Sequence, residues 1–228
     1  MAEIYLVRHG QASFNSENYD RLSDLGHQQS AYLGVYFALR NITFDHIFTG
    51  TQLRHSQTAE DILMAQPCTV SPTRQEGLNE YDFKALYHAF MAQHPHEAAA
   101  APMGDRRGDR RIFYQRLKKA LKLWSENRLA GDLPESWENF KSRVTDTLSQ
   151  IQESIGGTCL VVSSGGAISM ALGQILDLKP QKVIDLNLQI KNSSFSHIHL
   201  GHDRMHLSSF NNIPHLDRLD RLDAITFS

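Results

Sequence analysis

Residues 158–168 read TCLVVSSGGAI. The first six form a short apolar run rich in β-branched side chains, and two glycines, Gly165 and Gly166, follow shortly after it. Such a run is typical of a strand buried on both faces of a sheet. Directly after the glycines, Ile168, Ala171, Leu172 and Ile175 recur at helical spacing. A buried strand that passes through glycine into a helix is the repeating unit of parallel α/β sheets.

The same alternation of strand and helix extends outward from this run. Residues 3–7 and 45–49 are predicted strands, each followed by a helical pattern, over 24–40 and from Leu53 to Met64. Ser23 is a plausible N-cap for the first of these helices, and the last strands are expected at 193–200 and 204–209. The pattern predicts an α/β fold, specifically a three-layer α/β/α sandwich with a mostly parallel sheet.

The middle of the chain, from about 84 to 155, contains no good strand pattern. Apolar residues mark one amphipathic helix from Phe113 to Trp124 and a second from Trp137 to Ile155. Between His94 and Arg111 the sequence is irregular, and we expect a mobile loop that includes the basic run Arg106–Arg111. We therefore predict one domain over residues 1–228, with a helical insertion at about 84–155 over the C-terminal ends of the strands.

Composition limits the classes of function. The chain has 228 residues, 41% hydrophobic and 21% charged, so it can bury a substantial core. Its formal net charge of -2 gives no basis for binding nucleic acid or an anionic membrane. Cys68 and Cys159 match no metal or redox spacing, and no stretch approaches the roughly 20 apolar residues that span a bilayer. These features predict a cytoplasmic protein with reduced thiols.

Residues with chemistry to offer follow three of the predicted strands. Arg8 and His9 end the first strand, Arg54 lies in the first turn of the helix after the second, and Ser164-Gly165 follow the third. Ligands of parallel sheets bind at these strand ends, where helix N-termini and arginine forks attract phosphate oxygens. The sequence thus predicts a phosphate pocket that contains an imidazole.

With these residues assembled, the chain resembles the histidine phosphatase superfamily, also called the phosphoglycerate-mutase-like family. Arg8-His9-Gly10 matches the motif that names the family, and residues 54–59 match its Arg-x-x-Gln-Thr-Ala segment. Residues 22–29 look like its Leu-Thr, Gly, Gln helix start, and Leu78-Asn79-Glu80 like its Leu-x-Glu stretch. Further matches are Asn15 and the pair Asn192-Ser193.

The resemblance implies a role for each matching residue. His9 would attack phosphorus and become phosphohistidine, while Arg8, Asn15 and Arg54 would hold the phosphoryl oxygens. Glu80 would protonate the leaving oxygen and then activate water. Because His9 must be neutral at the attacking nitrogen, its other nitrogen should donate to a backbone carbonyl. The expected substrate is a small phosphorylated metabolite, hydrolysed without a cofactor; the sequence leaves the oligomeric state open, a dimer included.

Ser164 departs from the family pattern, which places a second catalytic histidine at this position. A neutral hydroxyl donor is worth roughly 1–2 kcal/mol less than a protonated imidazole, which lowers the rate about 5- to 30-fold. His55 or the Arg106–Arg111 loop could supply a compensating cation, and Ser164→His is expected to raise turnover if the site is otherwise intact. Ser164 and Gly165 are placed among the phosphate-binding groups.

Two alternative functions stay open. Phosphoglycerate mutases of this family usually carry an arginine after the glutamate, where this chain has Tyr81, so phosphoryl transfer between metabolites is less favoured. A catalytically weakened protein that only binds a phosphorylated ligand would retain the arginines but would not need His9 or Glu80. Tyr81 and Phe83 are candidates to line the substrate cleft, whereas Asp82 is expected to be structural.

The twelve histidines of the chain also raise the question of a metal. His94 and His96, and the alternating His197 and His199, are the best pairs. Neither pair has a third ligand at metal spacing in the sequence. The sequence therefore predicts no metal site.

Overall fold

The computed structural model describes residues 2–13, 20–66, 69–99, 106–201 and 204–227, and for residues 98–99 and 106–110 it describes the backbone alone. Asn15 and Cys68, which the sequence singles out, lie outside these ranges. Within them, six strands form a single sheet in the order β3-β2-β4-β1-β5-β6. The strands are β1 Ala2–Arg8, β2 His46–Thr49, β3 Thr73–Arg74, β4 Thr158–Ser163, β5 Phe195–Leu200 and β6 Met205–Asn212.

Neighbouring strands from β3 to β1 run parallel, while β5 pairs antiparallel with both β1 and β6. The strand predicted at 158–163 is central, flanked by β2 and β1, as its apolar composition indicates. The two-residue strand β3 has no apolar pattern and was not predicted. The mostly parallel sheet predicted from the sequence is confirmed.

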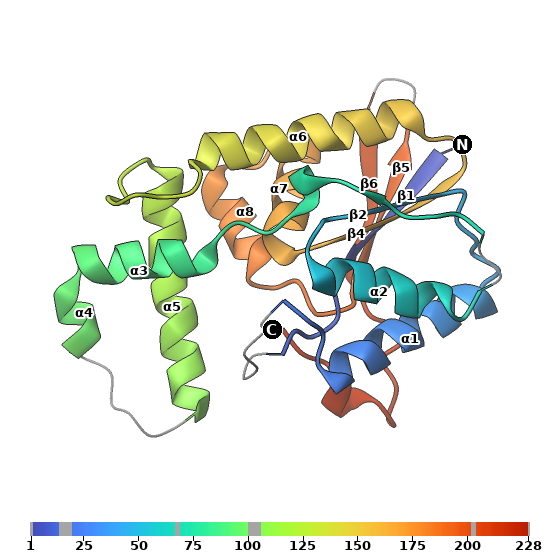
Figure 1. Ribbon diagram of the computed structural model, residues 1–228, viewed down its shortest axis with the longest axis horizontal. Helices are drawn as coiled ribbons and strands as arrows, with labels where there is room; N and C mark the ends of the chain where they lie inside the picture. The colour runs from blue at the N-terminus through green and yellow to red at the C-terminus, as the bar shows by residue number, and fades with distance from the viewer. Residues whose placement is uncertain (1, 14–19, 67–68, 100–105, 202–203, 228) are drawn as a thin grey trace.

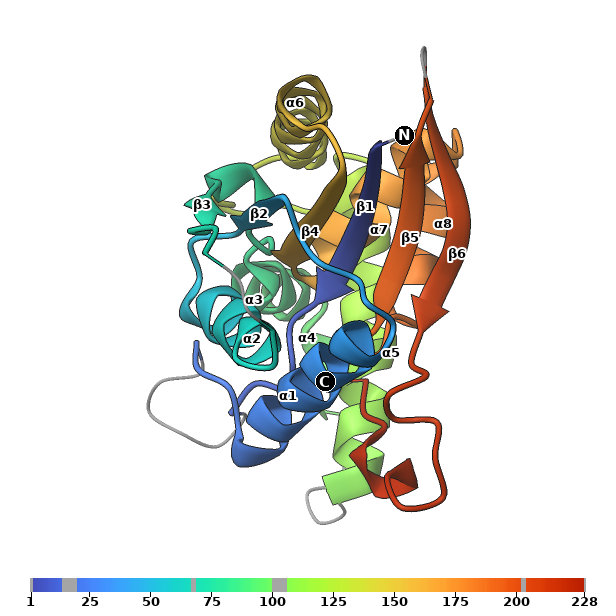
Figure 2. The ribbon, with the colours of Figure 1, turned by 90° about the vertical axis from the view of Figure 1, so that its right-hand side faces the viewer.

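Helices cover both faces of the sheet, which gives the three layers seen in Figures 1 and 2. Successive residues of β1 point to opposite faces: Tyr5 and Val7 pack with α1 and α2, whereas Ile4 and Leu6 pack on the side of α6, α7 and α8. The helices are α1 Asp24–Leu39, α2 Leu53–Leu63, α3 Phe83–Gln93, α4 Pro95–Ala99, α5 Arg106–Ser125, α6 Trp137–Ser154, α7 Gly165–Ile175 and α8 Pro180–Asn187, with short 3-10 turns at Glu76–Leu78 and Leu222–Ala224.

The helix starts follow local capping chemistry. Ser23, the predicted N-cap of α1, accepts a hydrogen bond from the Gly26 amide. Asp82 caps α3 through the Ala85 amide, which confirms its expected structural role. Trp124 and Phe140, with centroids 5.7 Å apart, pack α5 against α6 in the core.

The segment from about 84 to 155 is helical, but its helices occupy two places. Helices α3, α4 and α5 stand to one side of the sheet in Figure 1, and α3 and α5 reach the cavity that contains the end of β1. Helix α6 instead packs on the face of the sheet beside α7 and leads into β4.

The basic run Arg106–Arg111 was predicted to be a loop, and this was wrong. The run forms the first turns of α5, which begins at Arg106. Arginine has a high helix propensity, and the apolar stripe from Phe113 onward packs the helix against α3 and α8. No helix among the described residues is long and apolar enough to span a bilayer.

Candidate active site

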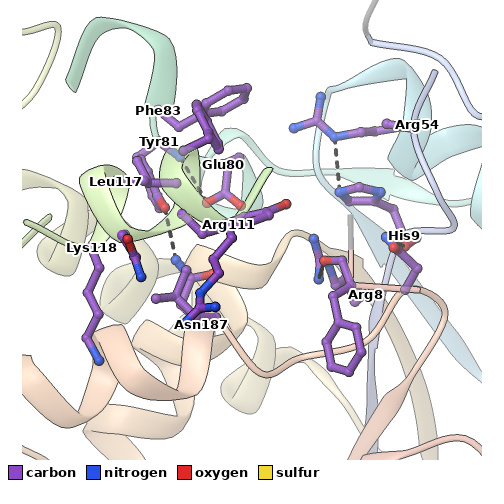
Figure 3. A pocket seen from close by; sticks show the side chains of 17 residues that line it. Arg8, His9, Arg54, Glu80, Tyr81, Phe83, Arg111, Leu117, Lys118 and Asn187 are labelled. Atoms are coloured by element: carbon purple, nitrogen blue, oxygen red, sulfur yellow. Dashed lines mark hydrogen bonds between the residues drawn. The ribbon is translucent and has the colours of Figure 1, made fainter. Parts of the chain in front are cut away.

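Three strand-to-helix junctions meet at one edge of the sheet. Arg8 ends β1 and His9 follows it directly, Arg54 lies in the first turn of α2 after β2, and Ser164 precedes α7 after β4. Because β2, β4 and β1 are adjacent and parallel, their C-terminal ends lie side by side. Figure 3 shows Arg8, His9 and Arg54 on one side of a cavity and Glu80 across from them.

His9 is held as a neutral imidazole with a defined tautomer. Its Nδ1 lies 2.7 Å from the Gly10 carbonyl oxygen, which can only accept, so Nδ1 carries the proton. Nε2 then keeps its lone pair and accepts a hydrogen bond from Arg54 Nε at 3.2 Å. Burial, followed by the charges of Arg54 and Arg8, holds the pKa of His9 well below its ordinary value. The predicted contact with a backbone carbonyl is confirmed.

Arg54 is buried and fixed by two residues that the sequence did not single out. Its NH1 donates to Asp20 Oδ1 at 2.7 Å, and its NH2 donates to Gln52 Oε1 at 2.7 Å. Asp20 Oδ2 also accepts from the Leu53 amide at 2.9 Å. Gln52 precedes the Arg54 motif by two residues and could have been suspected from its position. Asp20 carries no signal in the sequence, because only the fold brings it to α2.

Arg8 is anchored from the C-terminal part of the chain. Its NH1 donates to the carbonyl oxygens of Ile190 and Phe227, the latter at 2.7 Å. Gly165 lies beside the same guanidinium, since a Cβ there would come within 3.6 Å of Arg8 Cζ. Arg8 is buried yet lines the cavity, so a positive charge faces the space next to His9.

Glu80 reaches the cavity from the segment before α3. Its Oε2 accepts from the Gly166 amide at 3.1 Å, and its Oε1 accepts from the Tyr81 amide at 3.3 Å. Burial raises the pKa of Glu80, and the Gly166 hydrogen bond and the charge of Arg54 oppose that shift. A Cβ on Gly166 would lie 2.1 Å from Glu80 Oε1 and 2.4 Å from Cε1 of the buried Tyr81 ring, so any larger residue here would displace both side chains. The Gly166 amide at the β4–α7 junction therefore donates its hydrogen bond to Glu80 in this structure.

Ser164 and His55 form a buried pair beneath these groups. Ser164 Oγ lies 2.7 Å from His55 Nε2 and 3.5 Å from Arg54 NH2, and both Ser164 and His55 are fully buried. The rings of His55 and His9 are 5.6 Å apart. Burial and then the charge of Arg54 hold the pKa of His55 well below its ordinary value, which does not favour His55 as the compensating cation.

The cavity has a volume of about 490 Å³. Arg8, His9 and Arg54 line it on one side and Glu80 lines it across from them, while Ser164, predicted to bind phosphate, does not line it. Tyr81 and Phe83 line the walls as predicted, and Asn187 donates to the Tyr81 hydroxyl at 2.9 Å. Other lining residues are Ala12, Arg111, Phe113, Tyr114, Gln115, Leu117, Lys118, Leu188, Asn192 and Phe227.

This arrangement suits a phosphomonoester at one end of the cavity and its alcohol portion at the other. The phosphate end combines two guanidinium groups with an uncharged imidazole and a carboxyl group of raised pKa. Phosphoryl transfer needs positive charge, a positioned nucleophile and a proton donor for the leaving oxygen, and these residue types supply each of them.

Comparison with known proteins agrees with the geometry. A family model described as the histidine phosphatase superfamily (branch 1) matches residues 4–213. A protein of Hydrogenobacter thermophilus provisionally named phosphoserine phosphatase 2 is 23% identical over 230 residues, covering 96% of this chain and 100% of that protein. Phosphoglycerate mutase-like protein 4 of Arabidopsis thaliana is 26% identical over 184 residues, covering 75% of this chain and 69% of that protein.

Solved structures show the same fold. Phosphoserine phosphatase of Entamoeba histolytica, in complex with 3-phosphoglyceric acid, superimposes with a TM-score of 0.67 at 20% identity, covering 95% of this chain and 100% of that chain. A mycobacterial glucosyl-3-phosphoglycerate phosphatase in complex with inorganic phosphate gives a TM-score of 0.64 at 21% identity, covering 93% and 98%.

Proposed function

Since the chain belongs to the histidine phosphatase superfamily and is a phosphoric monoester hydrolase, we propose that it hydrolyses a small phosphomonoester through a phosphohistidine formed on His9. The observation that carries the proposal is the tautomer of His9. With Nδ1 donating to the Gly10 carbonyl, Nε2 is an unprotonated nitrogen beside two guanidinium groups. A passive anion site would gain nothing from a neutral imidazole at that point.

In the first step, His9 Nε2 forms a bond to phosphorus while the bond from phosphorus to the ester oxygen breaks. Phosphoryl oxygens take over the Arg54 N–H that His9 accepts in the free protein, which releases the lone pair for attack. Arg8 and Arg54 hold the charge of the transferring group, as preorganised donors in a buried site do. Asn15 is proposed as a further contact on the resemblance alone.

Glu80 is the proposed proton donor to the leaving oxygen. Its raised pKa keeps the carboxyl group protonated to higher pH than a glutamic acid in water. In the second step, the carboxylate that remains takes a proton from water, and the water oxygen attacks phosphorus. The P–N bond then breaks, inorganic phosphate leaves and His9 is restored.

Two neighbouring activities are compatible with the same residues. A mutase would form the same phosphohistidine but pass the phosphoryl group to a second metabolite. The name of the Arabidopsis relative points that way, whereas Tyr81 in place of an arginine argues for hydrolysis. Small phosphorylated metabolites are the proposed substrates, since the Entamoeba relative was solved with 3-phosphoglyceric acid. A cytoplasmic location stays a prediction from the sequence.

Hydrolysis of p-nitrophenyl phosphate by the wild type, His9→Ala and His88→Ala tests the proposal. His88 is exposed on α3 and serves as the matched histidine control. We expect turnover in the wild type and in His88→Ala, and a loss of at least about 10³-fold in His9→Ala. Phosphate release with equal activity in His9→Ala would refute the proposed nucleophile.

Rapid quenching without acid, followed by mass spectrometry, tests the covalent intermediate. We expect a phosphoryl group on the peptide that contains His9. Turnover without any such adduct would exclude the phosphohistidine route, and transfer of phosphate to a second metabolite without release of inorganic phosphate would replace the phosphatase by a mutase. Binding of phosphate without any turnover would show a ligand-binding protein.

A further inference from the structure

A second cluster of potential ligands lies near the other end of the sheet. Glu3 sits near the start of β1, and His197 and His199 lie on the adjacent antiparallel strand β5. In the sheet register Glu3 pairs with His199 and Tyr5 pairs with His197, so the three side chains share one face. His9 lies six residue steps of extended chain after Glu3, which places the cluster about 20 Å from the proposed nucleophile.

Sheet pairing supplies the third ligand that the sequence lacked. His197 and His199 alternate along β5, and Glu3 is 194 positions before His197 in the chain. Glu3 Oε2 lies 2.7 Å from His197 Nε2 and 3.9 Å from His199 Nδ1. One ligand atom from each of the three residues lies within 4.8 Å of the other two.

These distances fit a single small ion. Ligand atoms bound tetrahedrally at 2.0–2.2 Å from Zn²⁺ are about 3.4 Å apart. The two distances from Glu3 Oε2 fall on either side of that value, so rotamer adjustments of less than an ångström would bring the ligands into place. The side chains are 28%, 17% and 44% exposed for Glu3, His197 and His199, which leaves a fourth position open to water.

Neighbouring groups orient two of the three ligands. Thr158 Oγ1 donates to Glu3 Oε1 at 3.2 Å, which leaves Oε2 turned toward the histidines. The Tyr5 ring stacks on His197 with centroids 4.5 Å apart and an angle of 17° between the planes. Such outer contacts are typical of metal sites, where they hold ligand side chains in one orientation.

We propose that Glu3, His197 and His199 bind a divalent transition metal ion, Zn²⁺ in the first place, with water as the fourth ligand. Two imidazoles and one carboxylate form a donor set that zinc takes readily, whereas Mg²⁺ and Ca²⁺ prefer oxygen ligands throughout. The ion would join β1 to β5 and stabilise their pairing at that end of the sheet. The site is independent of the proposed phosphatase chemistry, which uses none of its residues.

Isothermal titration of the metal-free protein with Zn²⁺ tests the proposal in four proteins: wild type, Glu3→Gln, His199→Ala and His88→Ala. Glu3→Gln keeps the shape of the side chain and the oxygen that Thr158 contacts. We expect one strong site per chain in the wild type and in His88→Ala. Loss of one of three protein ligands should weaken binding more than about tenfold in the other two variants.

Two further measurements make the outcome specific. Zn²⁺ should raise the melting temperature of the wild type more than that of Glu3→Gln at the same zinc concentration, and Co²⁺ in place of zinc should show the visible absorption of a tetrahedral site. Wild-type protein that binds no Zn²⁺ at about 100 μM would overturn the proposal. Equal affinity in wild type and His199→Ala would overturn it as well, because the ion would then bind elsewhere.

Discussion

The Ser164→His variant should be less stable than the wild type and no faster, whereas the double variant His55→Ala/Ser164→His should be faster than His55→Ala. Ser164 is fully buried, with its Oγ 2.7 Å from His55 Nε2 and 3.5 Å from Arg54 NH2. An imidazole at position 164 replaces one oxygen by a five-membered ring in that space. Overpacking of this kind costs about 1–3 kcal/mol.

For a chain of this length, 1 kcal/mol corresponds to about 2–4 °C in melting temperature, so the single variant should melt about 2–12 °C lower. This packing argument leads to a different prediction from the one drawn from sequence alone, in which Ser164→His raises turnover in an otherwise intact site. Removing the His55 side chain in the double variant frees the space that the new ring needs. A histidine there can become charged against the bound phosphate and donate a charge-assisted hydrogen bond, which a serine hydroxyl cannot.

The gain from that hydrogen bond is about 1–2 kcal/mol, or about 5- to 30-fold in kcat/KM. The assay compares wild type, both single variants and the double variant by p-nitrophenyl phosphate hydrolysis and by thermal unfolding. His55→Ala is the control, because it opens the same space and retains Ser164. A Ser164→His protein that melts with the wild type and turns over faster would refute the packing argument. A double variant no faster than His55→Ala would refute the catalytic one.

Three further predictions follow from the contacts and pKa shifts of the site. Burial raises the pKa of Glu80, so kcat/KM for an alkyl phosphate should fall as pH rises through that pKa, and Glu80→Gln should lose this limb together with about 10²–10⁴-fold of the rate. Asp20→Asn should lower kcat/KM about two- to fivefold, mainly through KM, since Asp20 is 41% exposed and its ion pair with Arg54 is worth at most about 1 kcal/mol. The free energy of unfolding should fall as pH drops below about 6.5, because the unfolded chain protonates histidines that the folded protein keeps neutral, each adding up to about 1.4 kcal/mol per pH unit. In the folded protein, burial lowers the pKa of His55 well below its ordinary value and that of His215 to about 3. His215→Gln should therefore flatten the slope when the free energy of unfolding, measured with urea, is plotted against pH. The raised pKa of Glu80 changes stability with pH in the opposite direction.

Local patterns were enough to predict the parts of the fold that local physics decides. The run at 158–163 became β4 with the predicted bounds, and Ser23 caps α1, because burial and capping act over a few residues. The run Arg106–Arg111 was misread because charged residues are common in loops and at helix starts alike. Packing of the apolar stripe from Phe113 onward makes this segment helical.

Most of the site residues that could not be predicted from the sequence depend on contacts between segments far apart in the chain. Asp20 reaches Arg54 across 34 positions, and Glu3 reaches His197 across 194 positions. The first pair depends on how the segment before α1 lies against α2, and the second on strand order and register, and no single stretch of sequence encodes either. The role of His55 was also hidden, since only the structure shows its ring against Ser164 and away from solvent.

Burial is the largest cause of the pKa shifts of both His9 and Glu80, the proposed nucleophile and the proposed acid. Burial removes both His9 and Glu80 from most of their contact with water, and such desolvation disfavours whichever form of a group is charged. For His9 the charged form is the protonated one, so burial lowers its pKa, while for Glu80 it is the deprotonated one, so burial raises its pKa. Arg54 and Arg8 lower both pKa values, and for Glu80 they leave desolvation the larger effect. The same desolvation therefore favours the form of His9 without the proton and the form of Glu80 with it, which are the two forms that the proposed phosphoryl transfer to nitrogen uses.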